Sequence, residues 1–319
     1  MSSSLIPYNI NYIPFPFGLI NTGVICYFNS LLQSLLSCSS INYYFLINEY
    51  RLKKNDNKLA LLYIELLKQN INKQEKEMVY QSIIILKELV ITYKKKNPNC
   101  GMIGTSQEDI GEFLLFFIDA LDNKDIEKLF THTYKCDLYC QKCKKMDKIP
   151  NDISYQFEIP LDTSDSYELE NINNKEKREL NISNYIRNNV SKVSHRLCEH
   201  CKESDTLLKI SRLKLIPTIL VLNLNKFKNK KNINIKKTIE YENKSSKKIY
   251  IYKLVSVCEH SGNMNGGHYI CKSKRKKIDE SNIVDTEYIF NDRIFNKCTI
   301  ESTLNSYILF YHYENSIDL

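Results

Sequence analysis

One cysteine, Cys26, stands where a glycine-containing turn meets the start of an amphipathic helix. Unpaired N–H groups and the helix dipole at such a position favour a thiolate, so Cys26 could act as a nucleophile. Asn21, five residues upstream, is an amide donor that could reach the same point. A small buried side chain is the other interpretation, and this segment alone favours neither. The helix is indicated by apolar residues with helical spacing, namely Phe28, Leu31, Leu32, Leu35 and Leu36.

A second segment could supply the base that a thiol nucleophile needs. A strand opens on His268 directly after two glycines, which permit close backbone approach and unusual φ/ψ and would help to place the imidazole beside a substrate chain. Some twenty residues later, Asn291 or Asp292 could accept a hydrogen bond from the imidazole Nδ1–H. Cysteine, base and orienting residue form a catalytic triad, with Asn21 as the oxyanion donor. His260 has a comparable claim to be the base on sequence alone.

Four further cysteines indicate a metal site. They form two C-x-x-C pairs, Cys140 with Cys143 and Cys198 with Cys201. Four thiolates at this spacing close a tetrahedral Zn²⁺ site with no open position, so the metal would be structural. The alternative is that one pair is fortuitous. Cys136 could replace Cys140 or Cys143, and three nearby histidines are interpreted as bystanders: His132, His195 and His200.

The elements that must position these residues change in character near residue 130. Before it, helical spacing covers 59–67 and 79–90, and a helix opens at Ser106 with Asp109 in the capping-box position. Its apolar stripe is Ile110, Phe113, Leu114, Phe117, Ile118 and Leu121. After it, strands are predicted at 153–159, 218–227, 249–258, 268–272, 288–290 and 307–313. Residues 162–192 are expected to be a polar surface excursion. The predicted class is α+β, with a mainly antiparallel sheet and an inserted metal-bearing arm.

Composition bounds the class of protein. The 319 residues carry a net charge of +8, and 43% are hydrophobic, which is typical of a globular chain. The densest basic run, 272–277, is interpreted as a solvated hairpin loop. No signal peptide and no membrane-spanning apolar run are visible, so we expect a soluble intracellular protein. In a reducing compartment the eleven cysteines need an explanation other than disulfides.

Taken together, the segments 18–33, 107–115, 197–227, 266–269, 290–292 and 307–311 resemble the ubiquitin-specific protease family of deubiquitinating cysteine peptidases. The resemblance covers nearly the whole chain. It implies a papain-like cysteine peptidase core, with a helical thumb and a β-rich palm, and a zinc-ribbon fingers region. Residues 1–319 would then be a single catalytic domain, with the thumb at about 18–130, the fingers within about 131–225 and the palm at about 226–319.

The resemblance also implies roles. Cys26 matches the nucleophile, His268 the base, Asn291 the third triad member and Asn21 the oxyanion donor, in an enzyme that cuts after the C-terminal glycine of ubiquitin. Zinc would be structural, and the partners would be ubiquitin and ubiquitinated proteins, with no membrane or nucleic acid. A monomer in the cytoplasm, the nucleus or both is expected.

Asp109 and Glu112 match family positions that face the basic ubiquitin tail. A helix cap and a solvated helix face explain these two residues about equally well.

The sequence departs from the family pattern at three places. Val24-Ile25 replaces Asn-Thr before the cysteine, Glu287 stands where Trp is usual, and Asn225-Lys226-Phe227 replaces Lys-Arg-Phe. No catalytic group is lost, although the altered loop could reshape the oxyanion hole. Two alternative functions stay open: a catalytically silent ubiquitin-binding scaffold, and a zinc-ribbon protein that binds nucleic acid.

Overall fold

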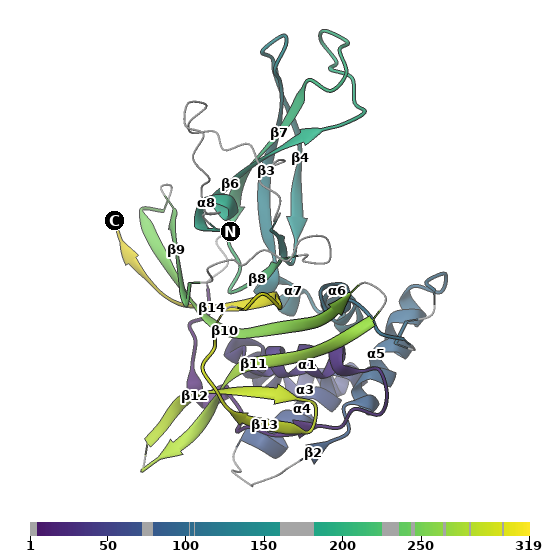
Figure 1. Ribbon diagram of the computed structural model, residues 1–319, viewed down its shortest axis with the longest axis vertical. Coiled ribbons are helices and arrows are strands. Elements are labelled where there is room, and N and C mark those ends of the chain that lie inside the picture. The colour runs from purple at the N-terminus through teal and green to yellow at the C-terminus, as the bar shows by residue number, and fades with distance from the viewer. Residues whose placement is uncertain are drawn as a thin grey trace.

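Figure 1 shows a layer of helices packed against a large sheet, with a second sheet that projects away from it. The computed structural model describes residues 5–71, 79–101, 103–104, 106–159, 182–224, 236–243, 246–263, 266–280, 282–301 and 303–319. The helices are η1 (Ile10–Tyr12, 3₁₀), α1 (Cys26–Leu36), α2 (Ser39–Ile47), α3 (Glu49–Lys54), α4 (Lys58–Ile71), α5 (Ile83–Lys96), α6 (Ile110–Leu121), α7 (Lys124–Phe130) and α8 (Ile182–Arg187).

Within the described residues the strands form three sheets. The main sheet has the order β13-β12-β11-β10-β14-β8-β5, and β9 pairs with β10; all its pairs are antiparallel except β5 with β8. Its strands are β5 (Phe157–Glu158), β8 (Ile219–Asn223), β9 (Thr238–Asn243), β10 (Lys248–Asn263), β11 (Gly266–Asp279), β12 (Asn282–Asn291), β13 (Ile294–Lys297) and β14 (Ser306–Asp318).

The projecting sheet, called the arm sheet here, has the order β4-β3-β7-β6. Its strands are β3 (His132–Cys140), β4 (Met146–Ser154), β6 (Asn188–Val193) and β7 (Leu207–Leu215). A short parallel pair, β1 (Gly18–Leu19) with β2 (Val79–Tyr80), completes the strands. The α+β class with an inserted arm is therefore confirmed.

Helix α1 lies at the centre of the core, and all eleven of its residues are buried. Its apolar side packs on α6, where the rings of Tyr27 and Phe113 lie 4.8 Å apart. Its polar side faces the main sheet, where the hydroxyls of Ser34 and Ser256 lie 2.9 Å apart. Because every polar side chain on this face needs a partner inside the protein, the helix is fixed both by packing and by hydrogen bonds.

Helix α6 has the predicted apolar stripe, and all six of its residues are buried. The predicted start at Ser106 is wrong. The helix begins at Ile110, and Asp109 is the N-cap, whose side chain accepts a hydrogen bond from the Glu112 N–H. Val79, predicted to share a helix with Ile83, lies in β2 instead.

Two further predictions need correction. The basic run 272–277 is part of strand β11, and its Arg275 is fully buried, so the run is no solvated loop. Of the predicted excursion 162–192, residues 162–181 lie outside the described residues, but α8 and β6 occupy its end. Strand β8 ends at Asn223, and residues 225–227 also lie outside the described residues. Among the described helices, none combines the length and apolarity needed to cross a membrane.

Candidate active site and metal site

Cys26 is the first residue of α1, as predicted, and only 2% of it is exposed. Ile25 occupies the N-cap and provides no side-chain hydrogen bond, so the first N–H groups of the helix are not capped by that residue. Burial raises the pKa of the thiol, and the negative charge of Asp292 adds to this effect. A hydrogen bond from the backbone N–H of Tyr269 acts in the opposite direction. Burial thus favours the neutral thiol, which lies beside strand β11.

His268 and Asn291 are brought together by neighbouring strands of the main sheet. His268 lies on β11 and Asn291 ends β12, and these strands pair from Cys271 opposite Phe290. The imidazole Nε2 lies 2.7 Å from the Asn291 Oδ1, so Nε2–H donates to the amide oxygen. The prediction that Nδ1 would make this bond is wrong. With Nε2 occupied, Nδ1 is the nitrogen that can accept the thiol proton.

Asp292 follows Asn291 and lies at the centre of a hydrogen-bond network that the sequence did not indicate. Its Oδ2 accepts from Asn21 Nδ2 at 3.0 Å, and its Oδ1 accepts from Asn29 Nδ2 at 2.7 Å. Its backbone oxygen accepts from the Leu19 N–H at 3.0 Å. The carboxylate thus joins the loop before Cys26, the helix α1 and the turn between β12 and β13. Asn29, three residues after Cys26, is polar in a largely apolar helix, which was the available signal.

Asn21 lies in the loop before Cys26, and both ends of its side chain are engaged. Its Oδ1 accepts from the Gly23 N–H at 2.9 Å and from the Ile25 N–H at 3.4 Å. Its Nδ2 donates one proton to Asp292. A carboxamide nitrogen carries two N–H groups, and among the contacts of the described residues only one of them is used, so the other can donate to an oxyanion.

His260, the alternative base, lies on β10 opposite Tyr269. Its ring packs against Tyr269 and Tyr307, at 4.4 and 6.0 Å between ring centroids. Since His268 is the histidine bonded to Asn291, the geometry favours His268 as the base.

Asp109 and Glu112 lie at the start of α6. Both oxygens of Asp109 are engaged: one accepts from the Glu112 N–H and the other from the Tyr307 hydroxyl. The capping interpretation of Asp109 is thus confirmed. The Glu112 side chain is largely exposed. Partial desolvation of its carboxyl group raises the pKa, and the negative charges of Asp109 and Glu108 raise it further. Three neighbouring acids make this surface negative.

The four cysteines of the two C-x-x-C pairs meet at the tip of the arm sheet. Their Sγ atoms all lie within 4.8 Å of one another. The Cys140–Cys201 and Cys143–Cys198 pairs are each separated by 3.7 Å. Zinc–sulfur bonds of about 2.3 Å in a tetrahedron place the sulfurs about 3.8 Å apart. The donor set therefore fits a metal ion such as Zn²⁺.

The neighbours of this cluster are not ligands. Cys136 lies 3.6 Å from the Ser211 hydroxyl, and His200 bonds Asp147 at 2.9 Å. Two of the basic side chains beside the cluster are paired with acids: Lys142 with Glu203, and Arg196 with Glu199. Such paired charges do not favour a nucleic-acid surface here.

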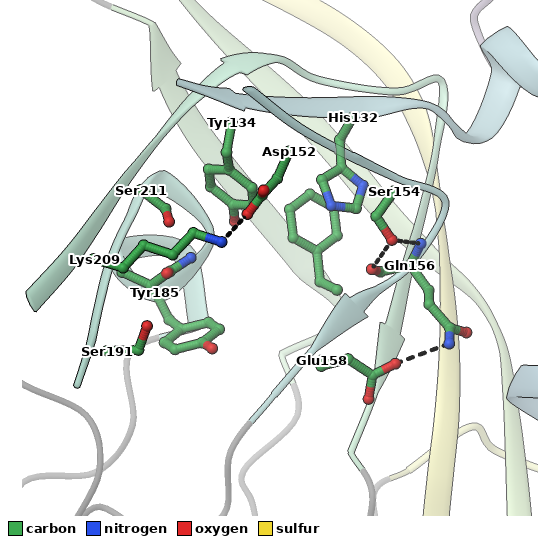
Figure 2. A pocket seen from close by; sticks show the side chains of 12 residues that line it. His132, Tyr134, Asp152, Ser154, Gln156, Glu158, Tyr185, Ser191, Lys209 and Ser211 are labelled. Carbon is green, nitrogen blue, oxygen red and sulfur yellow. Dashed lines mark hydrogen bonds and ion pairs between the residues drawn. The ribbon is translucent and has the colours of Figure 1, made fainter. Parts of the chain in front are cut away.

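A polar cavity of about 230 Å³ lies where the arm sheet meets β5 (Figure 2). At one side His132 stacks on Phe157, with 3.7 Å between ring centroids, and burial lowers the pKa of His132 to about 3. Among the described residues, His132 Nδ1 and Gln156 Oε1 have no hydrogen-bond partner. At the other side an ion pair joins Lys209 to Asp152 across the strands.

The same cavity reaches towards the acidic start of α6 through Glu158. This carboxylate accepts hydrogen bonds from Gln156 at 2.8 Å and from Asn223 at 3.3 Å. Burial raises its pKa, and the charge of Asp109 adds to the effect. Glu158, at the edge of the cavity, therefore lies close enough to Asp109 for the two charges to interact.

Known proteins were compared with the chain. The ubiquitin carboxyl-terminal hydrolase 51 of Mus musculus is 22% identical over 92% of this chain and 50% of its own length. The ubiquitin carboxyl-terminal hydrolase 10 of Saccharomyces cerevisiae is 23% identical over 93% of this chain and 47% of its own length. The chain thus spans about half the length of these curated relatives.

Among solved structures, the SAGA Ubp8/Sgf11/Sus1/Sgf73 DUB module bound to ubiquitin aldehyde matches with a TM-score of 0.64 at 18% identity, over 96% of this chain and 71% of that chain. At this identity the likeness concerns the fold, which is the papain-like fold with a cysteine-bearing ribbon that the sequence predicts. The family model of ubiquitin carboxyl-terminal hydrolase matches residues 17–311, so the chain belongs to the ubiquitin carboxyl-terminal hydrolase family.

Proposed function

We propose that the protein is a thiol-dependent deubiquitinase that hydrolyses the bond after the C-terminal glycine of ubiquitin in conjugates or chains. The observation that carries the proposal is that His268 Nε2 lies 2.7 Å from Asn291 Oδ1 on the neighbouring strand, while Tyr269, next to His268 on β11, directs its N–H to the Cys26 thiol. The family membership of the chain supports ubiquitin as the substrate. A solved neighbour described as bound to ubiquitin aldehyde supports it too.

In the proposed reaction, His268 Nδ1 takes the proton from Cys26, and the thiolate attacks the carbonyl carbon of the terminal glycine. Asn291 holds the imidazole through Nε2, so that Nδ1 faces the thiol. The oxyanion of the tetrahedral intermediate accepts the second Nδ2–H of Asn21 and the N–H groups at the start of α1.

The protonated His268 then gives its proton to the leaving amine, and the acyl-enzyme forms. Water then attacks this thioester while His268 accepts a proton from it. When the tetrahedral intermediate collapses, His268 gives this proton to the departing Cys26 sulfur. The raised pKa of the resting thiol means that the proton moves mainly once substrate and imidazole are aligned. The histidine is thus base and acid in turn.

The acidic surface at Glu108, Asp109 and Glu112 would receive the basic C-terminal segment of ubiquitin. Glu112 is the freest of these, because Asp109 is held by its cap and by Tyr307. The polar cavity at the base of the arm sheet, with Glu158 at its edge, would contact the globular part of ubiquitin. Positive charge on the ligand and negative charge here speed encounter as well as binding.

Zinc is the metal that best suits four thiolates, and we assign it to Cys140, Cys143, Cys198 and Cys201. With four sulfur ligands it would be structural and would close the tip of the arm sheet. The reaction itself uses no metal in this proposal. One catalytic domain over 1–319, with the helices as thumb, the main sheet as palm and the arm sheet as fingers, is the organisation we propose.

The test is turnover of ubiquitin whose C-terminus carries a fluorogenic aminocoumarin amide. Wild-type protein should release the fluorophore, and Cys26→Ala and His268→Ala should not. Asn291→Ala should retain partial turnover, since it removes the orienting group and not the base. A zinc-loaded wild type that binds ubiquitin without release would contradict the proposal.

That result would favour the scaffold function instead. One observation fits the scaffold: Cys26 is only 2% exposed, and burial raises the pKa of its thiol. The same observation also fits an enzyme in which bound substrate aligns the thiol with its base. Turnover, rather than binding, separates the two functions.

A further inference from the structure

Strand β11 has a short free edge beside Cys26. Strand β12 pairs with β11 only from Cys271 onwards, so within the described part of the chain the residues of β11 before Cys271 have no strand partner on that side. In an antiparallel strand, residues two apart turn their backbone groups to the same side. Tyr269 directs its N–H at the Cys26 thiol, and Gly267, two residues earlier, turns its N–H and C=O to the same free side.

The side chain of Gln107 occupies this free edge at Gly267. The Gly267 N–H donates to Gln107 Oε1 at 2.7 Å, and Gln107 Nε2 donates to the Gly267 carbonyl. A carboxamide holds one acceptor and donors in a single plane, so it can complete both backbone groups of one residue, as a neighbouring strand would. The two residues are 160 positions apart in the sequence.

Gly267 is held on its other side as well. A Cβ at this position would lie 2.4 Å from His260 Nε2 and 2.5 Å from the Ser261 carbonyl oxygen, so β10 approaches it as closely as a glycine allows. With β10 on one side and Gln107 on the other, Gly267 has little freedom to shift. The backbone of His268, the next residue, is therefore also held in place.

We propose that Gln107 is a positioning residue for catalysis: its carboxamide substitutes for the missing strand at Gly267 and thereby holds His268 in register with Cys26. The inference rests on the proposed function, because His268 is the base only there. Gln107 acts through the backbone of β11 and makes no contact with the reacting atoms. It also joins the segment before α6 to the main sheet, and α6 packs on α1.

The experiment compares Gln107→Ala with Gln69→Ala, which removes another exposed glutamine, on α4, where it bonds only Glu65 among the described contacts. We expect Gln107→Ala to lower kcat for the ubiquitin aminocoumarin amide about tenfold or more with KM little changed. The Gln69→Ala variant should match the wild type. Thermal unfolding of both variants should be alike, because both side chains lie at the surface.

A second variant, Gln107→Glu, tests the donor. Its carboxylate can still accept from the Gly267 N–H but sets an oxygen against the Gly267 carbonyl. Protonation restores a donor, so the ratio of its kcat to that of the wild type should rise as pH falls from 7.5 towards 5. The titratable groups around it are Glu108, Asp109, His260 and His268, and all are present in both proteins, so the ratio reports the effect of the introduced carboxylate.

A readout without ubiquitin separates this inference from the proposed function. Iodoacetamide alkylation of Cys26, mapped by mass spectrometry across pH, should shift in Gln107→Ala towards the profile of His268→Ala. If the alkylation profile shifts but the wild type does not turn over ubiquitin, the proposed function is contradicted. The effect of Gln107 on the position of His268 relative to Cys26 is then still supported. Unchanged kcat and unchanged alkylation in Gln107→Ala would overturn the positioning role, and so would a gain in activity, which would make the contact an inhibitory latch.

Discussion

Asp292→Asn is the substitution with the most specific expected outcome. The carboxylate accepts one amide N–H from Asn21 and one from Asn29, at 3.0 and 2.7 Å. Asparagine has the same shape and tolerates the left-handed backbone of this position, where φ is +52°. It keeps one acceptor oxygen but sets an NH₂ group against the other amide. The backbone is thus spared while the network loses its charge.

The magnitude follows from the two bonds. Two hydrogen bonds to a charged group contribute about 1.5–3 kcal/mol each and the one neutral bond that remains about 0.5–1.5 kcal/mol, so we expect a loss of roughly 2–5 kcal/mol in unfolding free energy. Loss of an oxyanion donor costs about 10²–10³ in kcat, and a misoriented Asn21 should cost somewhat less, about 10–100-fold. The reactivity of the Cys26 thiol should increase, because removing the negative charge of Asp292 lowers its pKa.

The assay therefore measures two rates on one variant. Turnover of the ubiquitin aminocoumarin amide should fall, whereas iodoacetamide alkylation of Cys26 near neutral pH should become faster. Asn21→Ala is the matched control, and the double variant should lose little more than either single one, because both act through the same donor. Turnover within twofold of the wild type, or equal losses of turnover and alkylation, would refute this reasoning.

Three further outcomes are expected. Arg275→Met should lower unfolding free energy by about 1–3 kcal/mol in urea titration, because it removes the guanidinium that donates to the Gln33 carbonyl at 2.8 Å and to the Gln33 side-chain oxygen; unchanged stability would contradict this. Burial lowers the pKa of His312 to about 4, so on acidification the unfolded chain binds a proton at this histidine before the folded chain does. The stabilising effect is complete above about pH 6.5 and should decline by up to about 3 kcal/mol as pH falls towards 4. His312→Gln should flatten this dependence of stability on pH, and an unchanged dependence would count against the prediction. Chelation of zinc, or Cys198→Ser, should speed hydrogen exchange in β3 and β7 and weaken ubiquitin binding while leaving iodoacetamide alkylation of Cys26 intact; slow exchange after chelation would oppose a metal at this site.

The reason for the His312 prediction is visible in its contacts. Its Nε2 accepts from the Ser40 N–H at 3.2 Å, and its Nδ1 lies 2.8 Å from the Tyr313 carbonyl oxygen. Only the neutral tautomer with the proton on Nδ1 satisfies both. A second proton on Nε2 would break the hydrogen bond from the Ser40 N–H and leave only the serine hydroxyls, such as that of Ser40 at 2.9 Å, as acceptors.

The parts of the site that were predictable are those fixed by local patterns. Helical periodicity located α1 and its first residue, and the C-x-x-C spacing located the sulfur cluster, because a tight turn alone brings two thiolates together. The glycine pair before His268 marked a close backbone approach, which the contact of Gly267 with β10 explains.

What could not be predicted depends on contacts between distant segments. Arg275 lies in a run of lysines typical of a loop, and only the packing of β11 on α1 gives its guanidinium the Gln33 oxygens. The choice of Nε2 over Nδ1 at His268 depends on how β12 sits beside β11. Asp292 was visible as a neighbour of Asn291, but its two amide partners come from a loop and a helix at the other end of the chain.

The central claim is that Cys26 is the thiol that attacks the ubiquitin C-terminus. Ubiquitin whose C-terminal carboxyl is replaced by a thiol-reactive electrophile should add once to zinc-loaded wild-type protein, and peptide mass mapping should place the bond on Cys26 among the eleven cysteines. Cys26→Ala should give no adduct. An adduct on another cysteine, an adduct that persists in Cys26→Ala, or no adduct with the wild type would contradict the account.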